Sequence, residues 1–328
     1  MRTILNILFG LAVAVAVRAE EPVSPFADLL NRSPNFAYKT LGGTQVWTDE
    51  FVFRDWRIQR NALTNHCRLL DGRDVRRESG DFNQCFHRFQ ELQKSIGLKP
   101  QDGKAVVLLH GLARSRDCMD DLGRYLENRG DYIPINIGYA STRCTLDEHA
   151  TGLATVLSRL DGIDEIDLVC HSLGNLVVRR YIALCQADDK DGVILDPRIK
   201  RMVMLGPPNQ GACLACKLAD NTLSDLVAGP CARFLAGDWK ENGKLLAVPP
   251  FAFGIVAGTK GRNPLVDSEN DMFLTVSETK LPGAADFLTL PLLHGELMDD
   301  ARSRECILRF LREGHFVAAD KRAPLVAE

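Results

Sequence analysis

Apolar and polar positions follow two different patterns along the chain. In residues 45–70, β-branched and aromatic residues are frequent, as in QVWTDEFVFRDWRIQ, and they predict one or two antiparallel strands. In residues 82–96 the apolar positions are spaced as on one face of a helix. Only beyond this helix does the pattern become regular, with short apolar runs that alternate with amphipathic segments.

The regular part of the chain predicts a parallel sheet. Predicted strands lie at 105–109, 132–137, 166–170, 202–205 and 253–257, and predicted helices lie at 119–126, 146–160 and 176–185, the first of them ended by Gly130. This alternation of strands and helices indicates an α/β fold, with a mostly parallel central sheet and helices on both faces.

Sheets of this kind bind ligands beyond the carboxyl ends of their strands. Three unusual segments stand at such ends: His110-Gly111-Leu112-Ala113-Arg114, His171-Ser172-Leu173-Gly174-Asn175 and Gly206-Pro207-Pro208-Asn209-Gln210-Gly211. Residues 212–250 then lack clean periodicity and predict an insertion over the site. Its leucine and aromatic residues would form a lid or acyl-chain wall, or else pack into the core, and the sequence favours neither.

Ser172 lies between a buried strand and a helix. An ordinary serine at this point would only cap the helix. The apolar strand directly before it and Gly174 two residues after it instead favour a tight turn that exposes the hydroxyl, because a side chain at Gly174 would crowd the packed turn. We therefore predict that Ser172 is a nucleophile.

At these motifs the chain resembles the α/β-hydrolase family, and more closely its secreted bacterial lipases and esterases. The resemblance covers roughly residues 104–313, and it departs from the family's Gly-x-Ser-x-Gly pattern because Cys170 stands at the first glycine. The segment Leu109-His110-Gly111-Leu112 is similar to the lipase loop whose backbone N–H helps to bind the oxyanion, and residues 206–211 are similar to the loop after the following strand.

Two backbone N–H groups must face the developing oxyanion, at about 2.7 to 3.1 Å. The candidates are the N–H groups of Leu112 and Leu173. His110 is a candidate second base, but a histidine at a strand end more often holds a loop through hydrogen bonds, and this structural role is the preferred one.

In this fold the catalytic triad runs in the order serine, acid, histidine. His294 and His315 follow Ser172 in the sequence. His315 stands at the end of an amphipathic helix, where it would face solvent or complement the helix dipole. His294 follows the apolar run FLTLPLL and precedes a glycine, so we predict that His294 is the base.

Four acidic residues compete for the role of the triad acid, namely Asp267, Glu269, Asp271 and Asp286. Asp271 is the best placed, because Glu269-Asn270-Asp271 followed by LTVS resembles the lipase Asn-Asp-Gly turn before a strand. Met272 replaces the glycine of that turn, so Asp267 remains an alternative. The prediction is that Asp271 orients His294.

These residues together predict cleavage of carboxylic esters through an acyl-enzyme intermediate, without a metal or cofactor. The expected substrate is a small or lipophilic ester, and an apolar substrate would bring transient contact with a lipid surface. Two alternatives remain open: an acyltransferase that uses the same triad, and a non-catalytic binding protein on a hydrolase scaffold.

The amino terminus predicts export. Arg2, the apolar run at 4–17 and Val17-Arg18-Ala19 have the pattern of a signal peptide, for which a membrane anchor is the alternative. We expect a signal peptide at 1–19, an arm at 20–44, one α/β-hydrolase domain at 45–315 with the insertion 212–250, and a tail at 316–328, in the periplasm or outside the cell. The formal net charge is −3, without long basic runs, so nucleic acid is not an expected partner.

The chain contains ten cysteines, a number that fits disulfide bonding in an oxidising compartment. A Cys67–Cys85 pair is expected, because these residues bracket a polar stretch, together with one pair among Cys213, Cys216 and Cys231. Zinc binding at Cys213 and Cys216 is the alternative, but a second CxxC and a nearby histidine are missing from this part of the sequence.

Overall fold

The computed structural model describes residues 45–187, 194–212, 222–261 and 268–326, with the side chains of 222–228 left aside. Several predictions from the sequence fall outside these ranges: the signal peptide at 1–19, the arm at 20–44, the roles of Cys213 and Cys216, and the alternative acid Asp267. Within the described ranges, no helix is both long and apolar enough to span a bilayer.

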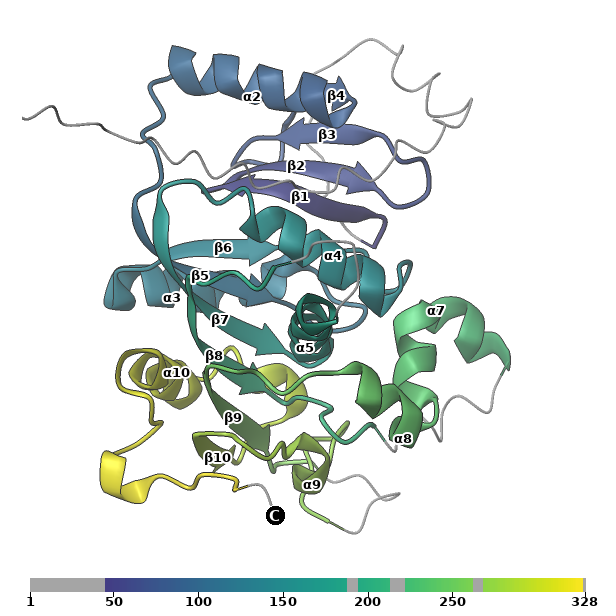
Figure 1. The fold of residues 1–328 in the computed structure, drawn as a ribbon, viewed down its shortest axis with the longest axis vertical. Coiled ribbons are helices and arrows are strands. Elements are labelled where there is room, and N and C mark those ends of the chain that lie inside the picture. Colours follow the sequence, from purple (N-terminus) through teal and green to yellow (C-terminus); the bar gives the residue numbers. More distant parts are fainter. Residues whose placement is uncertain (1–44, 188–193, 213–221, 262–267, 327–328) are drawn as a thin grey trace, which may run out of the picture.

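The larger sheet has six strands in the order β10-β9-β8-β7-β5-β6, and every neighbouring pair is parallel (Figure 1). Its strands are β5 (Gly103–Leu109), β6 (Ile133–Ile137), β7 (Ile163–His171), β8 (Ile199–Leu205), β9 (Ala252–Gly258) and β10 (Asp286–Leu290). The predicted fold class is therefore confirmed. The strand β10 was not predicted, because its short apolar run ends at Pro291 and has no polar alternation.

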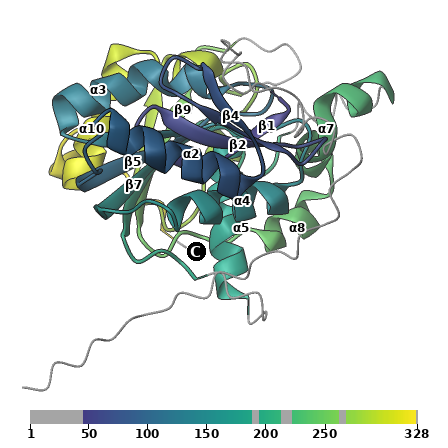
Figure 2. The same ribbon diagram turned by 90° about the horizontal axis from the view of Figure 1, so that it is seen from above.

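Helices cover both faces of this sheet (Figures 1 and 2). They are α3 (Asp120–Gly130) and α10 (Ala301–Glu313) on one face, and α4 (Leu146–Leu157) and α5 (Leu173–Gln186) on the other. Alternate residues of β5 enter the two cores: Val106 and Leu108 pack with α3 and α10, whereas Val107 and Leu109 pack with α4 and α5. A strand buried on both faces has no polar side to present, so its sequence is continuously apolar.

Local sequence sets the helix ends. A capping box between Thr145 and Glu148 begins α4, and the Asp300 side chain accepts backbone N–H groups at the start of α10. Helix α3 ends at Gly130, as predicted, and Asp131 after it takes the left-handed conformation, with φ 58°. An added Cβ at Gly130 would lie 2.6 Å from the Tyr132 ring, so close packing explains this glycine.

A second sheet precedes the parallel one. Its antiparallel strands, in chain order, are β1 (Trp47–Phe53), β2 (Trp56–Asn61), β3 (Cys67–Leu70) and β4 (Arg76–Gly80). The prediction of one or two strands in residues 45–70 was too low by the four-residue strand β3, and β4 lies beyond the range for which strands were predicted. Helix α2 (Phe82–Ser95) packs on this sheet through an apolar cluster that includes Phe51, Ile58 and Phe89.

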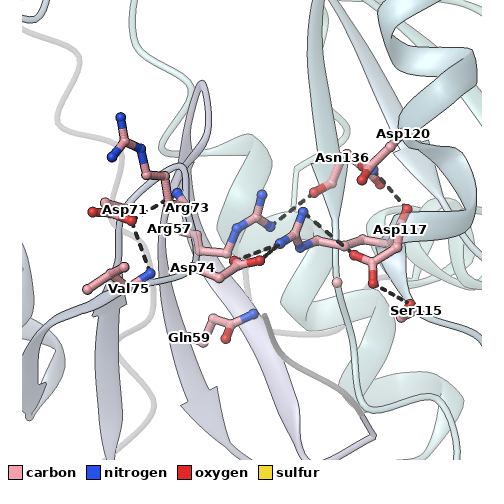
Figure 3. A network of polar contacts seen from close by, with 12 residues as sticks. Arg57, Gln59, Asp71, Arg73, Asp74, Val75, Ser115, Asp117, Asp120 and Asn136 are labelled. Atoms are coloured by element: carbon pink, nitrogen blue, oxygen red, sulfur yellow. Dashed lines mark hydrogen bonds and ion pairs between the residues drawn. The ribbon is translucent and has the colours of Figure 1, made fainter. Parts of the chain in front are cut away.

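The antiparallel sheet lies beside β6, and buried charges hold it there (Figure 1). Arg57 Nη1 donates to Asp49 Oδ2 at 2.7 Å within the sheet and to the carbonyl oxygen of Asn136 in β6 at 3.2 Å. Arg116 also reaches across, to Asp74 at 2.7 Å. Figure 3 shows this contact zone, with Arg57 and Asp74 on one side and Asn136 on the other. Because removing one partner would leave a buried charge unpaired, these contacts fix the sheet firmly against the α/β core.

The predicted insertion contains α7 (Thr222–Ala236) and α8 (Trp239–Asn242). In its described part, Cys231 and Leu235 are buried in the core cluster of α4 and α5, and Phe234 and Trp239 pack against the same cluster. These side chains therefore pack into the core, which is one of the two alternatives that the sequence left open. The kink of α7 at Gly229 lies against Thr142, where an added Cβ would come within 1.9 Å of the carbonyl oxygen.

The eight cysteines in the described ranges are all free. The expected Cys67–Cys85 disulfide is therefore a wrong prediction for this structure, and Cys231 is unpaired as well. Cys67 and Cys85 are both fully buried in the apolar cluster under α2, where a neutral thiol packs as a small hydrophobe. Burial raises the pKa of Cys67 to about 12, so the thiol stays protonated and unreactive.

Candidate active site

Ser172 stands on a sharp turn between β7 and α5. Its backbone has φ 52° and ψ −119°, a conformation that residues with a Cβ seldom adopt. It occupies the N-cap position of α5, yet its hydroxyl makes no capping hydrogen bond, and the side chain is only half-buried. The geometry therefore differs from that of an ordinary helix cap and is compatible with the nucleophile predicted at Ser172.

Two glycines let other loops approach this turn. At Gly174 an added Cβ would lie 2.7 Å from the carbonyl oxygen of Leu109, which explains why the turn requires a glycine there. At Gly111 an added Cβ would lie 3.0 Å from the Cβ of Ser172. Cys170, at the position of the family's first glycine, is fully buried, so the turn accommodates its small side chain within the core.

Asp271 and His294 come together from two different loops. Asp271 follows β9 and His294 follows β10, and Asp271 Oδ2 lies 2.6 Å from His294 Nδ1. The other carboxylate oxygen of Asp271 accepts the N–H groups of Phe273 and Leu274 at 3.0 and 2.8 Å. The carboxylate is 1% exposed, so it is held rigidly where it can fix the tautomer of His294.

The rival residues lie elsewhere or have other partners. Asp286 accepts the N–H groups of Phe287, Phe316 and Ala323, so it anchors the segment after α10. Glu269 is exposed. His315 lies 3.3 Å from Glu313 at the end of α10.

The loop of Asp271 differs from the predicted turn before a strand. A short helix, α9 (Val276–Thr279), follows it, because Thr275 and Glu278 form a capping box. Met272 takes the place of a turn glycine and keeps the left-handed backbone that glycine favours, with φ 87°. This conformation costs a residue with a side chain about 1–3 kcal/mol, and such strain concentrates at functional sites.

Ser172 and His294 are not joined by a hydrogen bond in this structure. The end of β8 and the residue after it lie between Ser172 and His294. The N–H of Ser172 donates to the carbonyl oxygen of Leu205 at 2.9 Å. An added Cβ at the next residue, Gly206, would lie 2.9 Å from the His294 ring. His171 adds a direct link, since its Nε2 donates to the carbonyl oxygen of His294 at 3.0 Å. In unliganded active sites, catalytic hydrogen bonds are often long and tighten when substrate binds.

The predicted oxyanion donors flank the serine. Leu173 is the first residue of α5, so its N–H has no acceptor within the helix and carries part of the positive end of the helix dipole. Leu112 is half-buried in the loop after β5. Within the described residues, neither N–H donates to another backbone carbonyl, so both are available to an anionic oxygen.

Two further buried histidines surround the site. His110 contacts the carbonyl oxygen of Gly111 at 2.8 Å and stacks on Tyr139, and burial lowers its pKa to about 4, so it is neutral and holds the loop. Burial also lowers the pKa of His171 well below its usual range. Sequence reasoning did not assign a role to His171, although its position next to the nucleophile was a visible signal. Among the described residues, no cluster of acidic, histidine and cysteine side chains could hold a metal ion.

Comparison with known proteins places this geometry in context. Residues 106–327 match the alpha/beta hydrolase family, so the antiparallel sheet at 47–80 lies outside the match. The lipase BlEst2 of Bacillus licheniformis in its propeptide form is similar over 70% of this chain and 54% of that chain, with 19% identity and a TM-score of 0.51. The mature form of BlEst2 is similar over 66% of this chain and 94% of that chain, with 18% identity and a TM-score of 0.48. A hydrolase of Oleispira antarctica is similar over 66% of this chain and 93% of that chain, with 14% identity and a TM-score of 0.45. No curated protein matches the chain.

Proposed function

The chain belongs to the alpha/beta hydrolase family, and from this premise we propose that it hydrolyses carboxylic esters with Ser172, His294 and Asp271 as its triad. The observation that carries the proposal is the buried contact of 2.6 Å between Asp271 Oδ2 and His294 Nδ1. It orients the imidazole so that Nε2 is the free nitrogen, on a loop that lies against the turn of a half-buried serine.

The proposed reaction proceeds in two steps. His294 Nε2 takes the proton of the Ser172 hydroxyl while the oxygen attacks the ester carbonyl, and it then gives that proton to the departing alcohol. Water next attacks the acyl-enzyme, with His294 again as the base, and releases the carboxylic acid and the free serine. Asp271 holds the tautomer and stabilises the imidazolium that forms in each step.

The oxyanion of each tetrahedral intermediate would lie between the N–H groups of Leu112 and Leu173. Such donors act strongly because they are already oriented before the charge develops, and loss of one typically costs about 100-fold or more in rate. The placement of Leu173 at the start of α5 supports this role, since the helix dipole favours negative charge there.

Two exposed apolar side chains support a lipophilic substrate. Met272 is 40% and Phe273 is 59% exposed, and the Phe273 ring lies 5.4 Å from the His294 ring. His294 must hand its proton to the leaving alkoxide, so the alcohol part of the ester comes to lie beside this histidine. Phe273 is then the apolar surface that the alcohol part meets, and the same two side chains are suited to transient contact with a lipid surface.

The experiment that tests this proposal compares the wild type with Ser172→Ala on nitrophenyl esters of increasing acyl length. We expect hydrolysis by the wild type and only background hydrolysis by the variant. Added alcohols as competing acceptors separate hydrolysis from acyl transfer, because a transferase would form a new ester in preference to the acid. A wild type that cleaves no ester would contradict the proposal.

We also propose that the protein is exported and loses residues 1–19. The support is the apolar run at 4–17 with small residues near Ala19. Amino-terminal sequencing of the protein recovered from outside the cytoplasm tests this proposal, and the first residue is expected near Glu20. A mature chain that keeps residues 1–19 would contradict it.

A further inference from the structure

The loop between β6 and α4, residues 138–145, lies between the antiparallel sheet and the oxyanion loop, which we define as residues 110–114. From the side of β1, Asp49 Oδ2 accepts the N–H of Gly138 at 2.7 Å, and Thr48 Oγ1 accepts the N–H of Ala140 at 3.2 Å. The N–H of Asp49 in turn donates to the carbonyl oxygen of Gly138 at 2.9 Å. The antiparallel sheet therefore fixes the backbone of this loop.

The opposite side of the same loop holds the oxyanion loop. The Tyr139 hydroxyl donates to the carbonyl oxygen of His110, and the two rings stack with their centroids 4.2 Å apart. Ser141 Oγ accepts the N–H of Ala113 at 3.0 Å. Ala113 has φ 57°, a strained conformation for alanine that persists only where the surroundings hold it. Contacts at His110 and Ala113 thus hold both sides of Leu112.

Gln45, just before β1, bonds directly both to the loop at residues 138–145 and to the oxyanion loop. Its Oε1 accepts the hydroxyl groups of Ser141 and Thr142, each at 3.0 Å, and its Nε2 donates to the carbonyl oxygen of Arg114 at 2.7 Å. Ser141 is fully buried, so the hydrogen bonds from Ala113 to Ser141 and from Ser141 to Gln45 are largely shielded from water. One amide side chain thereby joins the antiparallel sheet to the end of the oxyanion loop.

We propose that the antiparallel sheet positions the oxyanion hole, with Gln45 and Ser141 as positioning residues that orient the N–H of Leu112. This inference rests on the proposed function. It assigns a role to residues 45–80, which the family match does not cover. A donor must point at the oxyanion before the charge develops, and a misplacement of about 1 Å can cost 100-fold in rate.

The first test is the Ser141→Ala variant, which removes one buried oxygen. We expect kcat to fall about tenfold to 100-fold, below the loss typical of a deleted donor, while KM stays unchanged, because the donor acts on the transition state. Gln45→Glu is the second variant: its carboxylate still accepts the Ser141 and Thr142 hydroxyls but cannot donate to Arg114. It is expected to lower kcat in the same way, and it tests the idea even if Ser141→Ala folds poorly.

The matched control is Asp74→Asn, which weakens the Arg116 contact between the same two parts of the molecule without touching the oxyanion loop. We expect it to lower Tm and to leave kcat at the wild-type value. Such a result would separate a specific effect on the loop from a general loosening of the antiparallel sheet.

The readout that a merely structural role would not move is affinity for an alkyl boronic acid. Its boron accepts the Ser172 oxygen and becomes tetrahedral and anionic, so the adduct occupies the oxyanion hole. The inhibition constant of Ser141→Ala and Gln45→Glu should rise by about the factor by which kcat/KM falls. Wild-type kcat and boronate affinity in both variants would overturn the inference, as would equal losses in Asp74→Asn. A wild type without Ser172-dependent hydrolysis would instead overturn the proposed function.

Discussion

Asp271 and His294 are joined twice. Asp271 Oδ2 lies 2.6 Å from His294 Nδ1, and the N–H of His294 donates to the carbonyl oxygen of Asp271 at 3.0 Å. The backbone bond holds the two loops in register, and the side-chain bond turns the imidazole. Asp271 and His294 are 23 positions apart in the sequence, and their loops meet because β9 and β10 are neighbours in the sheet.

The Asp271→Asn variant tests this pairing. The amide oxygen can still accept the N–H groups of Phe273 and Leu274, so the loop should keep its conformation. The amide nitrogen cannot accept a proton from His294, so the imidazole favours the wrong tautomer, and kcat should fall about 10⁴-fold. The measurement is kcat for a nitrophenyl ester, with Asp286→Asn as the control, which should lose stability but not kcat. Near-wild-type activity of Asp271→Asn would exclude Asp271 as the acid.

Gly174→Ala tests the packing of the nucleophile turn. The new Cβ would lie 2.7 Å from the carbonyl oxygen of Leu109 and 2.9 Å from that of His110, and neither backbone atom can move freely. Such overpacking typically costs about 1–3 kcal/mol in the free energy of unfolding, and the displaced turn should also lose most activity. Gly152→Ala in α4 is the matched control, because its nearest neighbour is 3.6 Å away, and it should be neutral or slightly stabilising. Equal behaviour of the two variants in urea unfolding would refute the packing argument.

Phe273→Ala tests the proposed contact with the alcohol part of the ester. Burying a phenylalanine side chain is worth about 1.5–3 kcal/mol, and a partial contact should therefore give about a tenfold loss of kcat/KM for benzyl esters. Methyl esters of the same acid should be unaffected. Leu63→Ala, at another exposed apolar residue in the turn between β2 and β3, should change the rate for neither ester. A loss that is uniform over all esters, or one that follows acyl length, would show that Phe273 has a different role.

The free energy of unfolding should fall in mild acid. Burial lowers the pKa of His110 and of His149 to about 4, so both stay neutral in the folded protein, whereas in the unfolded chain they titrate near 6.5. Between about pH 6.5 and 4 the unfolded state binds more protons, and stability is lost as pH falls, by up to about 3 kcal/mol for each histidine.

Urea unfolding at pH 7.5 and pH 4.5 measures this loss. His149→Leu removes one of the two groups, so its stability should fall less between these two pH values than that of the wild type. If the wild type and the variant lose the same stability, His149 is not a source of the acid sensitivity.

The parts of the fold that sequence could predict are those with a local signal. Apolar runs indicated the strands from β5 to β9, and the sequence around Ser172 indicated the strand-turn-helix that the structure shows. The strand after Asp271 was predicted wrongly, because the resemblance to a lipase turn outweighed the capping box of Thr275 and Glu278, which begins a helix. The Cys67–Cys85 disulfide was predicted from spacing alone, which does not say whether two buried thiols are oxidised.

Other parts depend on contacts between distant residues, and a single sequence does not encode these in a readable way. Gln45 and Ser141 are 96 positions apart, and neither belongs to a motif that indicates an oxyanion loop. His171 is 123 positions from His294, and its hydrogen bond to the carbonyl oxygen of His294 follows only from the order of the strands. The fold suggests the order of the proposed triad residues along the sequence. The supporting contacts of Gln45, Ser141 and His171 follow no such rule.

The central claim is that Ser172 is an activated nucleophile, and reaction with a fluorophosphonate tests it most directly. The reagent phosphonylates a serine only where a base takes its proton and an oxyanion hole accepts the developing charge. Mass spectrometry of the labelled protein should find one added phosphonyl group, on the peptide that contains Ser172, and no label in Ser172→Ala. A wild type that stays unlabelled, or one labelled at another residue, would contradict the account.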